Sequence, residues 1–129
     1  MADAPAFEDV FAAHLRGDAT IVGLVGERIY PTVRPQGSSV PSIVYLVAEQ
    51  PLRSLDGHTS KLTRIDCEVS CFAKTNADAR QVARAVQERV DQVLVASLKL
   101  GVIQALSLYD NETKQHFVQM EILGWLEAD

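Results

Sequence analysis

Residues 28–45 of this chain read RIYPTVRPQGSSVPSIVY, and they separate a helical N-terminal section from a sheet. Residues 28–30 form a short, β-prone segment, which is expected to end at Pro31. Residues 31–41 contain three prolines, one glycine and two serines without an apolar period, which indicates a surface loop. The segment Ser42 to Glu49 is rich in Val, Ile and Tyr and is apolar on both faces. This composition predicts a strand that is buried on both sides or lies at a subunit interface.

Two helices are expected before this stretch. From about Ala6 to Leu15 the apolar residues recur at helical spacing, and two acids lie in the first turns. Gly17 is expected to end this helix, and Asp18 can cap a second, short helix that ends at Gly26. His14 lies at the edge of the apolar stripe and is expected to be a packing residue rather than a ligand.

Beyond residue 49, the pattern predicts a projecting hairpin and a half-buried strand. Residues Gln50 to Leu62 contain the turn signal Asp56-Gly57 and are interpreted as a long hairpin arm. In the next strand, about Leu62 to Ala73, two sets of side chains alternate. One set is Ile65, Cys67, Val69 and Cys71, and the other is Arg64, Asp66, Glu68 and Ser70. One face therefore belongs to the core, and the other faces water or a partner.

The C-terminal half completes an α+β pattern. Thr75 can cap a helix whose apolar stripe continues from Ala79 to Leu94. Two strands follow, about Gly101 to Tyr109 and Gln115 to Leu126, and a polar turn should join them as an antiparallel hairpin. We therefore expect one α+β domain over residues 1–129. Its mainly antiparallel sheet of about four to five strands should carry the long hairpin arm, with the helices packed on one face.

Size and composition limit the function. With 129 residues, 47% apolar and 22% charged, the chain fits one globular domain. A net charge of −5 argues against a protein that grips nucleic acid through clustered Lys and Arg, although not against one that surrounds DNA. No apolar run approaches the ~20 residues that a membrane span needs, and no signal peptide is evident. We therefore expect folding in a cytosol and no membrane partner.

The residues capable of catalysis or metal binding do not form recognisable sites. Cys67 and Cys71 lie four apart on a strand, so their Cα atoms are about 13 Å apart, beyond the ~7 Å that a disulfide allows. They are expected to be small buried apolar residues rather than a metal or redox pair. Asp66 and Glu68 lie on one face of a strand, about 6.6 Å apart, and could serve acid–base catalysis. With Arg64 beside them, a surface ion-pair row or a subunit contact is the more ordinary explanation. We expect no enzyme activity, no cofactor and no metal.

The order of these features resembles that of a known family. The RIYP motif at residues 28–31, the Pro/Gly loop, Pro41 and the IVY motif at residues 43–45 are similar to the tail completion proteins of tailed bacteriophages. These are also described as tail terminator or head–tail joining proteins, and related forms occur in phage-like gene transfer agents. Further parts of the resemblance are the RSLDG motif at residues 53–57, the acid-bearing strand from Arg64 to Phe72, the Ala/Val-rich helix that follows, and Trp125. The resemblance covers about residues 6–126.

This resemblance implies a structural component of a phage virion or phage-like particle, located at the head–tail junction and assembled in the bacterial cytoplasm. Family members resemble one another in forming a ring, commonly a hexamer, that caps the tail tube and joins it to a head-side connector or stopper protein. DNA passes through the lumen without sequence-specific binding. The loop from Pro31 to Val40 is a candidate for docking. The candidate ring or tube contacts in the arm and the strand after it are Arg53, Ser54, Leu55, Asp56, Gly57, His58, Arg64, Asp66 and Glu68.

Two other classes of protein are compatible with the sequence. A stand-alone cytosolic α+β binding or regulatory domain would use residues 56–58, Asp-Gly-His, as part of a ligand loop. A small hydrolase would use Asp66 and Glu68. Genome context separates the binding domain from the particle component, because neighbouring capsid, portal or tape-measure genes favour the latter. The hydrolase predicts that Glu68→Gln abolishes an activity while leaving the fold intact.

Overall fold

The computed structural model describes residues 7–33, 39–53, 59–91, 94–95 and 98–127. The helices are α1 (Phe7–Arg16), α2 (Ala19–Val25) and α3 (Asn76–Val90). The strands are β1 (Ile29–Pro31), β2 (Ser42–Arg53), β3 (Thr59–Ala73), β4 (Leu94–Val95), β5 (Leu98–Asp110) and β6 (Gln115–Glu127). This element order confirms the predicted α+β class. Among the helices in these ranges, none is long and apolar enough to cross a bilayer.

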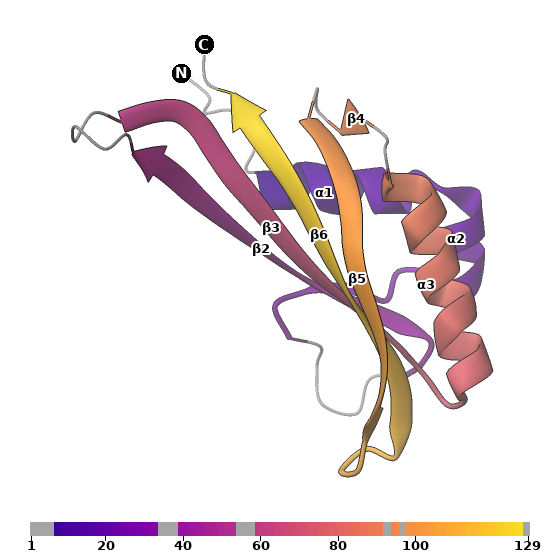
Figure 1. The fold of residues 1–129 in the computed structure, drawn as a ribbon. Coiled ribbons are helices and arrows are strands. Elements are labelled where there is room, and N and C mark those ends of the chain that lie inside the picture. Colours follow the sequence, from indigo (N-terminus) through magenta and orange to yellow (C-terminus); the bar gives the residue numbers. More distant parts are fainter. Residues whose placement is uncertain (1–6, 34–38, 54–58, 92–93, 96–97, 128–129) are drawn as a thin grey trace.

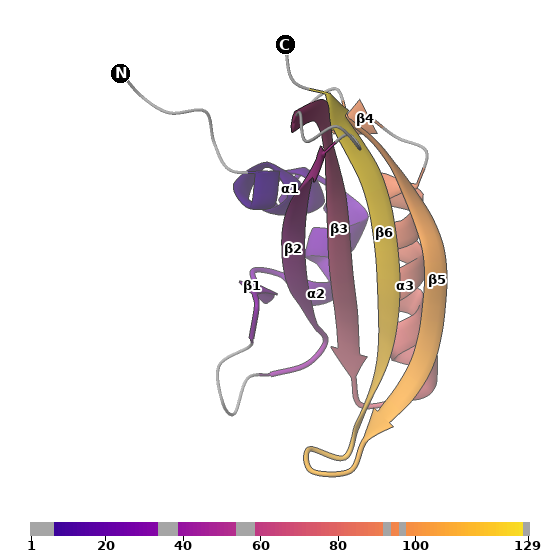
Figure 2. The same ribbon diagram turned by 60° about the vertical axis from the view of Figure 1, so that its left-hand side comes forward.

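The strands form one twisted sheet in the order β1-β2-β3-β6-β5-β4. Neighbouring strands are antiparallel, except that β1 and β2 are parallel. All three helices lie on one face of the sheet, as Figure 1 and Figure 2 show. No helix or strand that the structure describes covers the opposite face, which we call the open face.

Helix α3 provides the main cover of the sheet. Its buried stripe includes Val82, Val86 and Val90, and it packs on β3, β6 and β5. Successive side chains of a strand point to opposite faces of the sheet. Val69 of β3 and Met120 of β6 point to the face that the helices cover, and both are fully buried. Burying a side chain of this size contributes about 1.5–3 kcal/mol to the free energy of unfolding. The contact of α3 with β3 and β6 is therefore the centre of the core.

Helix α3 is shorter than the apolar stripe predicts. It begins as expected, because the Thr75 hydroxyl accepts a hydrogen bond from the Asp78 amide at 3.1 Å. It ends at Val90, because Asp91 takes an extended conformation and its carboxylate accepts a hydrogen bond from the Val102 amide at 3.0 Å. The prediction that the helix reaches Leu94 is wrong, since Leu94 pairs with β5 as part of β4.

Helix α1 ends before Gly17, and α2 begins after Asp18 and ends before Gly26, as the sequence predicts. Asp18 caps α2 by accepting hydrogen bonds from the Thr20 and Ile21 amides at 2.8 and 3.1 Å. Gly26 follows α2 with a φ of 61°, a conformation that favours glycine.

A reciprocal pair of hydrogen bonds fastens α1 to the end of α3. His14 Nε2 donates to the Arg89 carbonyl at 3.0 Å, and Arg89 Nε donates to the His14 carbonyl at 3.0 Å. Both residues are partly buried, and each bond satisfies a carbonyl near the C-terminus of a helix, where intrahelical donors are missing. His14 is therefore a structural residue, as predicted.

The stretch from residue 28 to residue 45 forms a parallel pair of strands around its loop, which the sequence did not predict. Residues 29–31 of β1 pair with residues 43–45 of β2. Arg28 holds the two ends of the loop together, because its Nε donates to the Pro41 carbonyl at 2.8 Å. The Arg28 carbonyl also accepts a hydrogen bond from the Ile43 amide at 2.9 Å.

Beyond its first residues, strand β2 is buried on one face only, so the expectation of burial on both faces is wrong within this chain. Ile43 and Tyr45 point into the core, whereas Leu46 on the open face is 46% exposed. The reason is that the helices cover a single face of the sheet. A subunit interface is the alternative that the sequence allows for this strand.

Cys67 and Cys71 are free, buried core residues, as the sequence predicted. Burial, with a smaller contribution from the neighbouring Asp66 charge, raises the pKa of the Cys67 thiol to about 12. Burial alone raises the pKa of Cys71. The thiolate is the nucleophile in cysteine chemistry, so burial and the raised pKa both lower the reactivity of these thiols in the folded protein.

We predict that Arg89→Ala lowers the free energy of unfolding by about 1–2 kcal/mol, because it removes a hydrogen bond between α1 and α3. Thermal unfolding followed by circular dichroism measures this change. Gln81→Ala, an exposed position on the same helix, is the control and should leave the unfolding temperature unchanged. Equal unfolding temperatures for the two variants would refute the structural role of this contact.

We also predict that a thiol reagent at pH 8 labels both cysteines at least about a hundredfold more slowly in the folded protein than in denaturant. The raised pKa keeps the thiols protonated at this pH, and the fold blocks access to them. Labelling rates within tenfold of those in denaturant would show that these thiols are accessible.

Candidate assembly interface

The open face presents its residues in rows that cross four strands. One row consists of Leu46, Glu68, Glu121 and Gln104, from β2, β3, β6 and β5 in that order. The polar residues of β3 lie on this face, so its predicted alternation is confirmed. The same alternation that directs one set of side chains into the core therefore directs the other set onto the open face.

One end of the open face is apolar. Phe72 of β3 and Phe117 of β6 are directly opposite and stack with ring centroids 4.9 Å apart. Leu108 of β5 is opposite Phe117, and Leu106 lies one row away. Leu108 and Leu106 remain 39% and 46% exposed. Aliphatic side chains this exposed on neighbouring rows form a surface suited to contact with another protein.

The centre of the open face is polar and acidic. Arg64 Nε donates to both carboxylate oxygens of Asp66, at 3.1 and 3.0 Å. The Gln119 amide donates to Glu68, which lies directly opposite Glu121. The predicted ion-pair row is therefore present for Arg64 and Asp66, whereas Glu68 faces a second carboxylate.

A shallow hollow of about 310 Å³ lies over this acidic centre, and its lining includes Leu46, Arg64, Asp66, Glu68 and Glu121. The carboxylates are partly or fully exposed to water rather than enclosed. Within the described ranges, no three His, Cys, Asp or Glu side chains are grouped so that they could hold a metal ion. The arrangement suits electrostatic contact with a partner.

The hairpin arm exists, and its strands are longer than expected. Strands β2 and β3 remain paired as far as Arg53 and Thr59, and Figure 1 shows this end of the hairpin extending beyond the helices. Residues Ser54, Leu55, Asp56, Gly57 and His58 lie outside the described residues. In the candidate docking loop, Val33 is 73% exposed.

Both edges of the main sheet are incompletely paired within the described residues. On the outer side of β2, β1 pairs only with residues 43–45, so the backbone from Leu46 onward has no partner strand among the described residues. On the outer side of β5, β4 pairs only with Leu98 and Lys99. An exposed strand edge is a template for pairing with another chain. Besides the apolar β2, the sequence contained a signal in β5: residues 105–109, ALSLY, include only one residue without an apolar side chain, Ser107.

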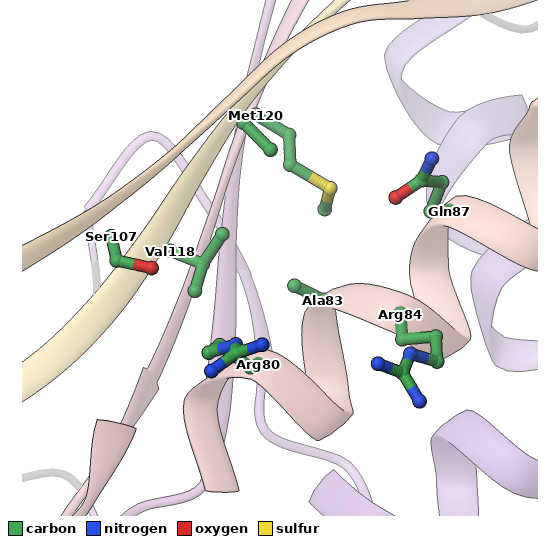
Figure 3. A pocket seen from close by; sticks show the side chains of 8 residues that line it. Arg80, Ala83, Arg84, Gln87, Ser107, Val118 and Met120 are labelled. Atoms are coloured by element: carbon green, nitrogen blue, oxygen red, sulfur yellow. The ribbon is translucent and has the colours of Figure 1, made fainter. Parts of the chain in front are cut away.

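A groove of about 260 Å³ lies between α3 and β5. Figure 3 shows Arg80, Arg84 and Gln87 from the helix around a space bordered by Ser107 and Met120 from the sheet. Neither arginine forms an ion pair within the part of the chain that the structure describes. The periodicity of the helix placed these arginines away from the apolar stripe, but it could not show that they border a groove.

Comparisons with known proteins agree with this architecture. A family model described as tail completion protein gp17 matches residues 10–124. A chain in a solved structure titled "Virion of native gene transfer agent (GTA) particle" has the same fold, with a TM-score of 0.76 and 18% sequence identity. The alignment covers 95% of this chain and 96% of that one. No curated protein sequence matches significantly.

The family match extends over both edges of the sheet, the open face and all but the first turn of α1. It therefore includes every surface described above and is not limited to the core. Tail completion proteins are structural, non-enzymatic components of phage-type virions. The exposed carboxylates on the open face agree with this, because they suit contact with a partner better than catalysis. This chain belongs to the tail completion protein gp17 family.

Proposed function

We propose that this protein caps the tail tube as an oligomeric ring of about six copies and joins the tail to the head-side connector. The observation that carries this proposal is the pair of incompletely paired sheet edges flanking a partly apolar open face. Exposed strand edges are a liability for a domain that acts alone, whereas a ring subunit can bury them. The fold shared with a chain of a gene transfer agent virion supports the same role.

The charge of the chain suits a channel for DNA. Six copies at −5 each carry a formal charge of −30. An acidic lumen repels the phosphate backbone and lets DNA slide, whereas a basic lumen would retain it. DNA would therefore pass through the ring without sequence-specific binding.

The projecting parts of the domain are the proposed docking elements. The arm from Gln50 to Lys61 and the loop from Pro31 to Val40 would contact the tail tube protein and the head-side connector. Arg64, Asp66 and Glu68 would contribute polar contacts, because they lie exposed or partly exposed on the open face near the base of the arm.

Family membership weighs against the two other classes of protein. A hydrolase using Asp66 and Glu68 conflicts with a non-enzymatic family. A stand-alone binding domain would leave the family match and the open edges without explanation.

We predict that particles produced without this protein have tails of uncontrolled length or tails unattached to heads. Electron microscopy of negatively stained particles measures tail length and the fraction of joined particles. Restoring the wild-type gene on a plasmid is the control. Normal, attached tails in its absence would contradict the proposed role.

We also predict that the protein forms a ring of about six copies on isolated tail tubes. Native mass spectrometry of the released ring should give about 85 kDa, which corresponds to six 14.1 kDa chains. A monomer in free solution is compatible with this, because the tube can template assembly. A strictly monomeric protein even with tail tubes present would refute the ring.

A further inference from the structure

We propose that the ring is closed by antiparallel pairing between the outer edge of β5 in one copy and the outer edge of β2 in the next. This inference rests on the proposed ring and specifies the surfaces that form it. The occupant of each open edge is then a second copy of this chain.

Strand direction is the first argument for this pairing. Strands β2, β3, β6 and β5 are neighbours in that order, and each adjacent pair is antiparallel. A second copy placed beside β5 with its helices on the same side therefore presents its β2 antiparallel to β5. The contact joins two different surfaces, and such contacts generate rings when the rotation closes.

The backbone hydrogen-bonding groups of the two edges are in matching positions. The Ile43 amide and the Tyr45 carbonyl of β2 already bond outward, to residues of the β1 segment. Alternation along a strand makes Val47 and Glu49 the next residues that bond outward, and Pro51, which follows, has no amide hydrogen.

The same alternation, followed through the paired residues from β2 to β5, makes Ala105, Ser107 and Tyr109 the outward-bonding residues of β5. At the other end of β5, the Val102 amide is already occupied by Asp91. The usable part of this edge therefore begins at Gln104. In both strands, the outward-bonding residues carry side chains that point toward the helix face.

Apolar surface is complementary across this pairing. Leu46 on β2 is 46% exposed on the open face, and Leu106 and Leu108 on β5 are 46% and 39% exposed on the same face. When Leu46 of one copy lies opposite Leu108 of its neighbour, these side chains pack against one another and become buried from water.

Charge is complementary on the other face. An antiparallel register that pairs Leu46 with Leu108 also pairs Glu49 with Ala105. In this register β5 must diverge from the neighbouring β2 beyond Leu108, because β1 already occupies the outer side of Val44 and Tyr45. Ala105 borders the groove that Arg80 and Arg84 line. The exposed Glu49 carboxylate of one copy would then lie near two guanidinium groups that have no ion-pair partner within the described residues of their own chain.

Disulfide trapping tests the pairing directly. Leu46 and Leu108 would form a non-hydrogen-bonded pair, whose Cα atoms are about 4.5 Å apart, within the range for a disulfide. A chain carrying both Leu46→Cys and Leu108→Cys is assembled on isolated tail tubes, oxidised, and run on a non-reducing gel. We expect a ladder that ends at the closed ring. A mixture of the two single variants should stop at dimers.

The matched control carries Leu46→Cys with Trp125→Cys. Trp125 is 47% exposed on the open face but belongs to the interior strand β6, so no ladder is expected. Rings of normal mass without a ladder from the Leu46/Leu108 variant would overturn this pairing and leave the ring intact. Trapping of Leu108→Cys to the tail tube protein would overturn it by assigning a different occupant. Absence of rings from the wild-type chain would instead refute the proposed ring itself.

A charge exchange gives an independent test. Glu49→Arg and Arg84→Glu should each reduce ring formation on tail tubes several-fold, because each places like charges at the contact. The double variant should recover most of the loss. Glu112→Arg, at the exposed β5–β6 turn, is the control and should assemble normally. Additive losses in the double variant would contradict contact between these residues.

Discussion

The one-sided burial of the sheet under α3 is the constraint on which the rest of the structure depends. The apolar stripe of the helix requires one apolar face from β3, β6 and β5, and alternation along the strands then directs every other residue away from the helices. Because the described helices all lie on that side, Leu46, Leu106, Leu108 and Trp125 remain partly exposed on the other. The surfaces available for assembly are thus consequences of how the core is filled.

Much of the fold could be predicted because its signals are local. The caps at Asp18 and Thr75 and the alternation of residues 64–71 depend on neighbours in the chain, and the structure confirms them. The end of α3 could not be predicted, because the apolar stripe continues past the point where Asp91 bonds to β5. The parallel pairing of β1 with β2 also depends on a contact across the loop, made by Arg28.

The candidate interface was only partly predictable for the same reason. The acidic residues of β3 were evident from their alternation, and the apolar character of β2 indicated a possible subunit contact. That β5 forms an open edge depends on the strand order, which places β6 beside β3 and β5 on the far side of β6. The groove between α3 and β5 likewise exists only in three dimensions, so Arg80 and Arg84 could not be distinguished from other exposed arginines.

These features fit the proposed ring subunit, which would complete its surface only in an assembly. The most direct test is an electron cryomicroscopy map of the head–tail junction, at a resolution that separates strands, in particles containing this protein. We predict a ring in which β5 of each copy lies antiparallel to β2 of the next, forming a continuous sheet around the lumen. A ring whose copies meet through their helices, or a junction without a ring of this protein, would contradict this prediction.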